Sequence, residues 1–163
     1  MQIFFDPSFR NWGWVYWDGE IKDAGVITTS ESKGFAGDIE ACKQLNCGLK
    51  KVLSVKHDMV IAESPVGSQS SRAAVGIGVV IALLSQIENL ETITPFYIKK
   101  RWGFKEKSDS LMLFVKKFPN YSWIKGKWGN LPYSEKNSHI ADALAAGLLY
   151  IHKSCNSISS MVF

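Results

Sequence analysis

The stretch QIFFDPSFRNWGWVYWDGEIKDAGVITT, residues 2–29, decides the fold of this chain. Three runs within it are rich in aromatic and β-branched residues and predict strands, at residues 2–5, 13–17 and 21–29. The first run stops at Asp6-Pro7, which predicts a turn, and Asp18-Gly19 is a hairpin signal between the other two. Together these features predict an antiparallel meander with Asp6 near one end.

After this meander the apolar residues alternate between strand-like and helical spacing. Compact apolar runs predict two further strands, at residues 58–62 and 92–95. Helical spacing and capping residues predict helices at about 35–55, from Ser70 or Ser71 to about 88, from Ser108 to about 118, and from Asn137 or Ser138 onward. Between these helices we expect a basic loop at residues 99–107 and an irregular segment at residues 120–136.

The resulting order is βββαβαβ followed by two helices. It predicts an α/β fold, with a five-stranded mixed sheet that has an N-terminal antiparallel meander and is flanked by helices. The length of 163 residues suits one domain, expected over residues 1–153, with a tail at residues 154–163. Apolar residues make up 46% and charged residues 21%, which is typical of a soluble globular protein. No apolar run is long enough to cross a membrane, and no signal peptide is visible.

The three cysteines, Cys42, Cys47 and Cys155, favour a reducing compartment. Their number is odd and they include no Cys-x-x-Cys pair, so neither a disulfide framework nor a structural zinc site is expected. We therefore expect a cytoplasmic protein of a bacterium, or of a phage in its host, while an organellar protein with a removed presequence is the alternative.

Positive charge is concentrated in one segment of the chain. Residues 99–136 hold ten Lys or Arg against three Asp or Glu, whereas the rest of the chain holds nine against twelve. Such a segment indicates a surface that faces a polyanion. A solvated, lysine-rich loop region is the alternative that charge alone leaves open.

Two acidic residues follow runs that are expected to be buried strands, Asp6 and Glu63. Ligands of open α/β sheets bind at such strand ends. If the two strands are neighbours, the carboxylates lie side by side and repel each other unless a cation intervenes. Oxygen-preferring divalent ions such as Mg²⁺ or Mn²⁺ are the natural partners of this pair.

The last predicted helix adds His139 and Asp142, which are three residues apart and so share one helical face. An imidazole and a carboxylate on one face suit a metal site. The sequence leaves open whether His139 binds a metal or transfers protons. Taken singly, each of the four residues also fits a turn or the first turn of a helix, so their joint placement carries the hypothesis.

The four residues lie in short motifs that follow one another in the order Asp6-Pro7-Ser8 with Asn11-Trp12-Gly13-Trp14, Ile61-Ala62-Glu63-Ser64-Pro65 with Ser71-Arg72-Ala73-Ala74, Glu106-Lys107-Ser108, and His139-Ile140-Ala141-Asp142-Ala143-Leu144-Ala145. In composition and order these motifs resemble those of the RuvC family of Holliday junction resolvases. The resemblance extends from residue 3 to about residue 150.

The resemblance implies an RNase H-like fold and a homodimer that makes paired, symmetry-related nicks in a four-way DNA junction. It also implies two Mg²⁺ or Mn²⁺ ions per active site. The residues that it assigns to metal binding and catalysis are Asp6, Glu63, His139 and Asp142, with Lys107 as a further catalytic residue. Lys99 and Lys107 are expected to face the scissile phosphate or its neighbours. The expected DNA-binding residues are Arg72, Lys99, Lys100, Arg101, Lys105 and Lys107.

Two positions depart from the family's pattern. Ser8 stands where the family has glycine, a change that a turn tolerates. Val66 stands where the family often has an aromatic residue that stacks on junction bases. Either a nearby Trp or Phe replaces that aromatic side chain, or the junction is opened in another way.

Two other functions fit the same residues. One is a nuclease of the same fold that acts on RNA–DNA hybrids or on other branched substrates, and the other is a catalytically silent junction-binding protein. The quaternary structure also has two interpretations. The helix from Ser71 contains Gly76 and Gly78, which fit either a dimer face or close packing of that helix on the sheet.

Overall fold

The first 28 residues form the predicted meander in the computed structural model, which describes residues 1–30, 34–67, 70–124 and 134–154. Strand β1 (Gln2–Asp6) pairs with β2 (Asn11–Trp17), and β2 pairs with β3 (Ile21–Thr28), both in antiparallel fashion. Gly19 has a φ of 75°, a left-handed conformation that glycine adopts without strain. The hairpin predicted at Asp18-Gly19 is therefore confirmed.

The two later strands extend the sheet on the other side of β1. Strand β4 (Met59–Glu63) pairs with β1 in parallel, and β5 (Leu90–Ile93) pairs with β4 in parallel, so the strand order is β3-β2-β1-β4-β5. The predicted five-stranded mixed sheet is confirmed. Because β1 and β4 are parallel neighbours, their carboxyl ends, Asp6 and Glu63, lie at the same edge of the sheet.

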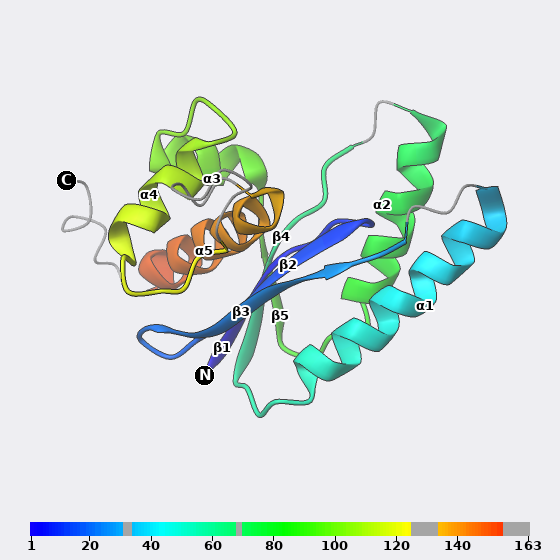
Figure 1. Ribbon diagram of the computed structural model, residues 1–163, viewed down its shortest axis with the longest axis horizontal. Coiled ribbons are helices and arrows are strands. Elements are labelled where there is room, and N and C mark those ends of the chain that lie inside the picture. Colours follow the sequence, from blue (N-terminus) through cyan, green and yellow to red (C-terminus); the bar gives the residue numbers. More distant parts are fainter. Residues whose placement is uncertain (31–33, 68–69, 125–133, 155–163) are drawn as a thin grey trace.

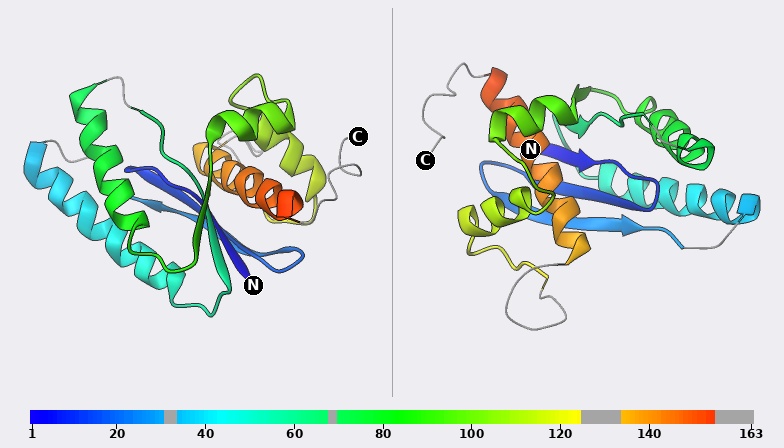
Figure 2. Two further views of the ribbon diagram at one scale, coloured as in Figure 1. Left: turned by 180° about the vertical axis from the view of Figure 1, so that it is seen from behind. Right: turned by 90° about the horizontal axis from the view of Figure 1, so that it is seen from above.

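Helices cover both faces of the sheet, as Figures 1 and 2 show. One face carries α1 (Gly34–Leu53) and α2 (Ser71–Leu84), and its core contains Ile3, Phe5, Val60 and Ala62. The other face carries α3 (Pro95–Trp102), α4 (Asp109–Lys117) and α5 (Glu135–Ser154), and its core contains Phe4, Val15 and Ile61. Successive residues of β1 point to opposite faces, which explains why a run of apolar residues is needed there.

Helix α5 lies directly on the sheet because two glycines leave no side chain between them. A Cβ atom at Gly13 of β2 would collide with the backbone carbonyl of His139. A Cβ atom at Gly147 of α5 would collide with the ring of Phe4 in β1. The close approach at Gly13 brings the start of α5 to the end of β1.

Two predicted segments differ from the structure. The strand expected at residues 92–95 lies two residues earlier, as β5, and the helix α3 occupies the first part of the basic loop expected at 99–107. Thr94 caps this helix by accepting a hydrogen bond from the backbone N–H of Tyr97, and Pro95 occupies its first position. The Thr-Pro pair is thus a helix start, and three helices rather than two follow the sheet.

Smaller differences concern the ends of elements. Helix α2 ends at Leu84 instead of about 88, and α5 begins at Glu135, before the predicted Asn137 or Ser138. Ser70 caps α2 as predicted, whereas Ser108 makes no capping bond to α4. There the Asp109 carboxylate accepts hydrogen bonds from two backbone N–H groups of the preceding loop.

Some sequence predictions fall outside the described residues. They concern residues 125–133 of the irregular segment, most of the tail at 154–163, and Cys155. The domain boundary at residue 153 therefore stays a prediction. Cys42 and Cys47 are both free thiols. Within the described ranges, no helix combines the length and the apolar character that crossing a membrane requires.

Candidate active site

The four candidate residues come together at one edge of the sheet. Asp6 ends β1 and Glu63 ends β4, while His139 and Asp142 lie on α5, near enough for His139 to contact Asp6 and for the charge of Asp142 to act on Glu63. All four side chains are partly buried. The carboxylates are close enough for the charges of Asp6 and Asp142 to act on Glu63.

His139 and Asp6 form the tightest contact of the site. Nδ1 of His139 donates a hydrogen bond to Oδ2 of Asp6 at 2.6 Å, and only about a sixth of each side chain is exposed, 15% and 16%. Burial disfavours the charged ring, but the hydrogen bond and charge of Asp6, with the charges of Asp142 and Glu135, outweigh it and raise the pKa of His139 above its ordinary value. Asp6 thus fixes the ring orientation and leaves Nε2 for another partner.

Glu63 has the most perturbed carboxyl group of the site. Burial, together with the charges of Asp6 and Asp142, raises the pKa of Glu63 to about 8, against the opposing charge of Lys99. A carboxyl group with this pKa is held in a place where negative charge is in excess. A cation that enters the site would favour its ionised form.

Asp142 is held by a neighbour from α4. The hydroxyl of Ser110, a residue only 2% exposed, donates a hydrogen bond to Oδ1 of Asp142 at 2.6 Å. Burial and the charge of Asp6 raise the pKa of Asp142 to about 6, although the Ser110 hydrogen bond and the charges of His139 and Lys107 act in the opposite direction. Ser110 therefore stabilises the ionised carboxylate.

We expect the substitution Ser110→Ala to shift the pH–rate profile of any activity that needs ionised Asp142, at the side where activity falls with decreasing pH. Loss of the hydrogen bond raises the pKa of Asp142 further, so half-maximal activity shifts to higher pH, while activity well above that pH stays near the parental value. A pH–rate profile of the variant beside the parent measures the shift. An acid limb at unchanged pH would show that Ser110 does not tune Asp142.

Among the described residues, no group of three or more His, Cys, Asp or Glu side chains is drawn together closely enough to form a ready-made metal site. The donor chemistry nevertheless suits an oxygen-preferring divalent ion, because three carboxylates share one edge of the sheet. Burial is the main cause of the raised pKa values of Glu63 and Asp142, the charge of Asp6 adds to it, and the neighbouring lysines offset only part of the rise.

Two of the predicted lysines lie beside the carboxylates. A pocket of about 360 Å³ is lined by Lys99 of α3 and Lys107 of the α3–α4 loop, together with Glu63, Asp142 and Ser110. Val66 also lines it and is 59% exposed.

The other predicted DNA-binding residues lie outside this pocket or are described only in part. Lys100, Arg101 and Lys105 are exposed but do not line this pocket, and only the backbone of Arg72 is described, within α2.

A second pocket, of about 530 Å³, opens on the other side of Asp6 and Glu63. Its walls are the connection of residues 7–10 and the first half of α2, and it contains one arginine, Arg10. The sequence analysis did not predict a role for Arg10, because most of the positive charge of the chain lies at residues 99–136. The feature that could have indicated Arg10 is a single cationic residue four positions after Asp6, in the turn that follows β1.

The strand order β3-β2-β1-β4-β5 of the mixed sheet, with helices on both of its faces, is that of an RNase H-like fold. The predicted fold class is therefore confirmed. Two solved structures of RuvC from Thermus thermophilus share this fold, each with 18% sequence identity over 96% of this chain and 96% of that chain. The structure in complex with a Holliday junction substrate matches with a TM-score of 0.66, and the other with 0.62. No model of a protein family and no curated protein sequence matches the chain.

Proposed function

We propose that this protein is a structure-selective DNA endonuclease that resolves four-way junctions by paired, metal-dependent nicks. The observation that carries the proposal is the convergence of three carboxylates, from β1, β4 and α5. Glu63 and Asp142 line a cleft together with Lys99 and Lys107, and Asp6 adjoins Glu63 on its other side. This cleft lies on a fold shared with a RuvC protein that was solved with a Holliday junction. Structural likeness at this identity extends to the fold, so the site residues carry the rest of the proposal.

The carboxylates would hold two Mg²⁺ or Mn²⁺ ions. We infer that Asp6, Glu63 and Asp142 would hold these ions, and that His139 would either complete the set with a neutral ring or transfer protons instead. When bound, such ions make water more acidic and offset charge on the leaving oxygen of a phosphodiester. The raised pKa values of Glu63 and Asp142 support the assignment, because a buried excess of negative charge favours a divalent cation.

The side chains themselves would orient the reactants and manage protons. Asp6 holds His139 through Nδ1, so Nε2 is the atom that can give or take a proton at the substrate. The raised pKa of His139 favours the protonated ring, which suits donation of a proton to the leaving oxygen. Lys107 and Lys99 would place positive charge against the scissile phosphate.

Affinity for DNA would come mainly from phosphate contacts of the basic residues Arg72, Lys99, Lys100, Arg101, Lys105 and Lys107. Such binding weakens steeply as salt rises, because each contact releases condensed counterions. The exposed positions of Lys100, Arg101 and Lys105, next to the cleft lined by Lys99 and Lys107, support this assignment.

We infer a homodimer from the outer face of α2. Exposed small and aliphatic residues recur along it at helical spacing, at Ala74, Val75, Gly78, Ile81 and Ala82. An uncharged apolar stripe of this kind on the surface of a protein is typical of an interface.

The two glycines of α2, Gly76 and Gly78, have different roles. Gly76 packs against Phe9, whereas a Cβ atom at Gly78 would meet open space.

We expect the substitution Ile81→Glu to convert the dimer to a monomer. Ile81 is 52% exposed in one chain, so the change is tolerated by the fold, but a buried, unpaired carboxylate at an interface is strongly unfavourable. Sedimentation at micromolar concentration measures the change. Val55→Glu, at an exposed position outside α2, is the matched control and should stay dimeric. A parent protein that sediments as a monomer would contradict the inference.

The proposal is tested by incubating the protein with Mg²⁺ and three labelled substrates: a four-way junction, a flap and an RNA–DNA hybrid. We expect symmetric nicks in the junction and little cutting of the other two. Preferential cutting of the hybrid would support the related nuclease instead. Tight binding of the junction without any cutting, with Mg²⁺ or Mn²⁺, would indicate a junction-binding protein.

A further inference from the structure

The cleft around the carboxylates has two halves. One half, between α3 and α4, carries Lys99 and Lys107, and the other, beside the connection of residues 7–10, carries Arg10. Glu63 and Val66 line both halves, Asp6 lines the half with Arg10, and Asp142 lines the half with the lysines. Each half also holds a further acid, Asp38 or Glu106, so the site carboxylates lie between the cations of the two halves. A DNA strand that presents one phosphate to the carboxylates would therefore extend into both.

We propose that the half beside residues 7–10 is a subsite for the nucleotide on the far side of the cut from Lys99 and Lys107, and that Arg10 binds a phosphate of that nucleotide. The inference rests on the proposed function and deepens it, because it assigns a second DNA-contacting wall to the cleft. The pocket volume of about 530 Å³ is within the range of pockets that hold ligands of nucleotide size.

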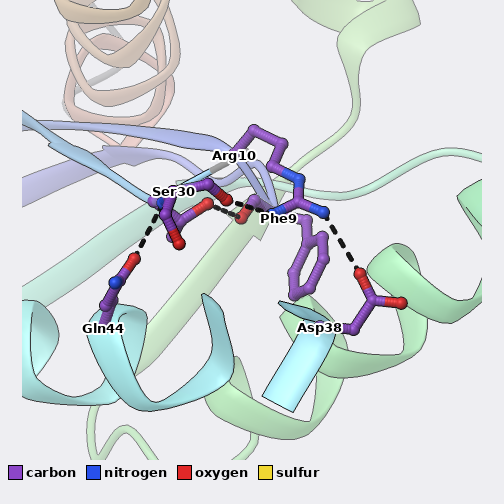
Figure 3. A network of polar contacts seen from close by, with 6 residues as sticks. Phe9, Arg10, Ser30, Asp38 and Gln44 are labelled. Carbon is purple, nitrogen blue, oxygen red and sulfur yellow. Dashed lines mark hydrogen bonds and ion pairs between the residues drawn. The ribbon is translucent and has the colours of Figure 1, made fainter. Parts of the chain in front are cut away.

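Arg10 is held in place before any ligand arrives, as Figure 3 shows. Nη1 of Arg10 donates to the backbone carbonyl of Ser30 at 2.7 Å, and Nη2 donates to the Asp38 carboxylate at 3.1 Å. The guanidinium carbon lies 4.8 Å from the centre of the Phe9 ring. A third of the Arg10 side chain, 33%, remains exposed. A fixed, planar and partly exposed guanidinium binds phosphate with little further loss of side-chain freedom.

The connection that carries Arg10 is also fixed. The backbone N–H of Thr29 donates to the carbonyl of Arg10 at 3.0 Å, and the Thr29 hydroxyl donates to the carbonyl of Phe9 at 3.3 Å. The side chain of Phe9 packs against α2 at Gly76, where a Cβ atom would come within 3.1 Å of it. The wall is thus tied to the end of β3 and to α2, which makes it a preformed surface.

The remaining lining suits the other parts of a nucleotide. Pro65 and Val66 offer apolar surface for the face of a nucleobase, and Ser8 offers a hydroxyl group, whereas the Ser64 hydroxyl donates to the backbone carbonyl of Ile93. Asp38 offsets part of the charge of Arg10. Asp6 and Glu63 also line the pocket, and on the proposed function bound ions offset their charge when the substrate is present.

The test is the salt dependence of junction binding, measured at one fixed concentration of Ca²⁺ in place of Mg²⁺, so that bound ions offset the carboxylates while cutting is avoided. We expect Arg10→Gln, which keeps most of the side-chain volume, and Arg10→Ala to weaken binding and to reduce the log–log salt slope by about 0.9, the value for one phosphate contact. Asp38→Asn should instead tighten binding and keep the slope, because it removes a nearby negative charge. Lys22→Ala, which breaks the exposed Lys22–Glu20 pair of the β2–β3 hairpin, is the matched control and should change neither.

A purely structural role for Arg10 gives a different pattern. Asp38→Asn would then weaken binding as the Arg10 variants do, and no variant would change the salt slope, so this result would overturn the subsite. A salt slope equal to that of the parent protein in both Arg10 variants would also overturn the subsite. A parent protein that neither binds nor cuts the junction would overturn the proposed function itself, which keeps the two failures distinguishable.

Discussion

Replacing Asp6 by Asn should slow junction cutting by about a thousandfold or more, which corresponds to about 4 kcal/mol of lost transition-state stabilisation. Asn matches Asp in shape, so β1 and its pairing with β2 and β4 should be preserved. What disappears is the charge. The asparagine that replaces Asp6 lacks the charge that holds divalent ions. The His139 ring would then lose the charged acceptor that favours its protonated form.

Three measurements separate these effects from simple loss of structure. Thermal unfolding should show a folded variant, junction binding should stay within a few-fold of the parent, and NMR titration should show a lower pKa for His139. Asp58→Asn is the matched control, because it removes one carboxylate at an exposed place near the chain start and should cut at the parental rate. Parental cutting by the Asp6 variant would remove the central claim of the proposed function.

The meander was accessible from sequence, because local signals decide it. Turn residues at Asp18-Gly19 and the apolar runs around them specify the hairpin. The position of β4 beside β1, and with it Glu63 beside Asp6, stood only as a condition in the sequence argument. The structure meets that condition, because the crossover helix α1 returns the chain to the free edge of β1.

The helix α3 shows where local signals mislead. Residues 92–95 combine β-branched residues with a proline, a composition that fits the end of a strand as well as the start of a helix. In the structure the hydroxyl of Thr94 accepts from the N–H of Tyr97, and Ile98 is buried against the sheet-covering helices. Tertiary packing of that apolar side chain decides between the two conformations, and sequence spacing alone does not contain it.

The partners of the site residues could not be predicted from the sequence, for a different reason. Ser110 contacts Asp142 across 32 positions, and Arg10 contacts Asp38 across 28. Such pairs depend on how α4 lies on α5 and how α1 lies beside the β1–β2 connection, which no local pattern specifies. Sequence reasoning therefore predicted the acidic residues and two flanking lysines, while the residues that hold and tune them required the structure.

Glu63→Gln should make the metal-free protein more stable at high pH while abolishing its activity. The pKa of Glu63 is about 8 in the folded protein and 4.5 in the reference state, so ionisation of this residue opposes folding. The sign follows from linkage. The penalty is absent well below pH 4.5, grows as pH rises through the window from 4.5 to about 8, and is complete above it. Glutamine carries no charge and escapes the penalty at every pH.

We expect the variant to unfold at a temperature higher than the parent by about 10–20 °C at pH 9 in EDTA, because a pKa that moves from 4.5 to about 8 corresponds to about 5 kcal/mol in the free energy of unfolding. The difference should shrink toward pH 5. Glu20→Gln, at an exposed residue whose pKa is lowered by Lys22, should show no such gain and is the matched control. Equal unfolding temperatures of variant and parent at pH 9 would contradict the excess of negative charge at this edge of the sheet.

Divalent ions should reverse the order of stability. Mn²⁺ or Mg²⁺ binds the folded parent and so raises its unfolding temperature, whereas the variant lacks one of the carboxylates that would hold the ions and gains less. A site that destabilises its own fold until a cation arrives is expected where function needs metal binding more than it needs stability. The crossing of the two stability curves with added metal would link the raised pKa of Glu63 to the proposed chemistry in a single experiment.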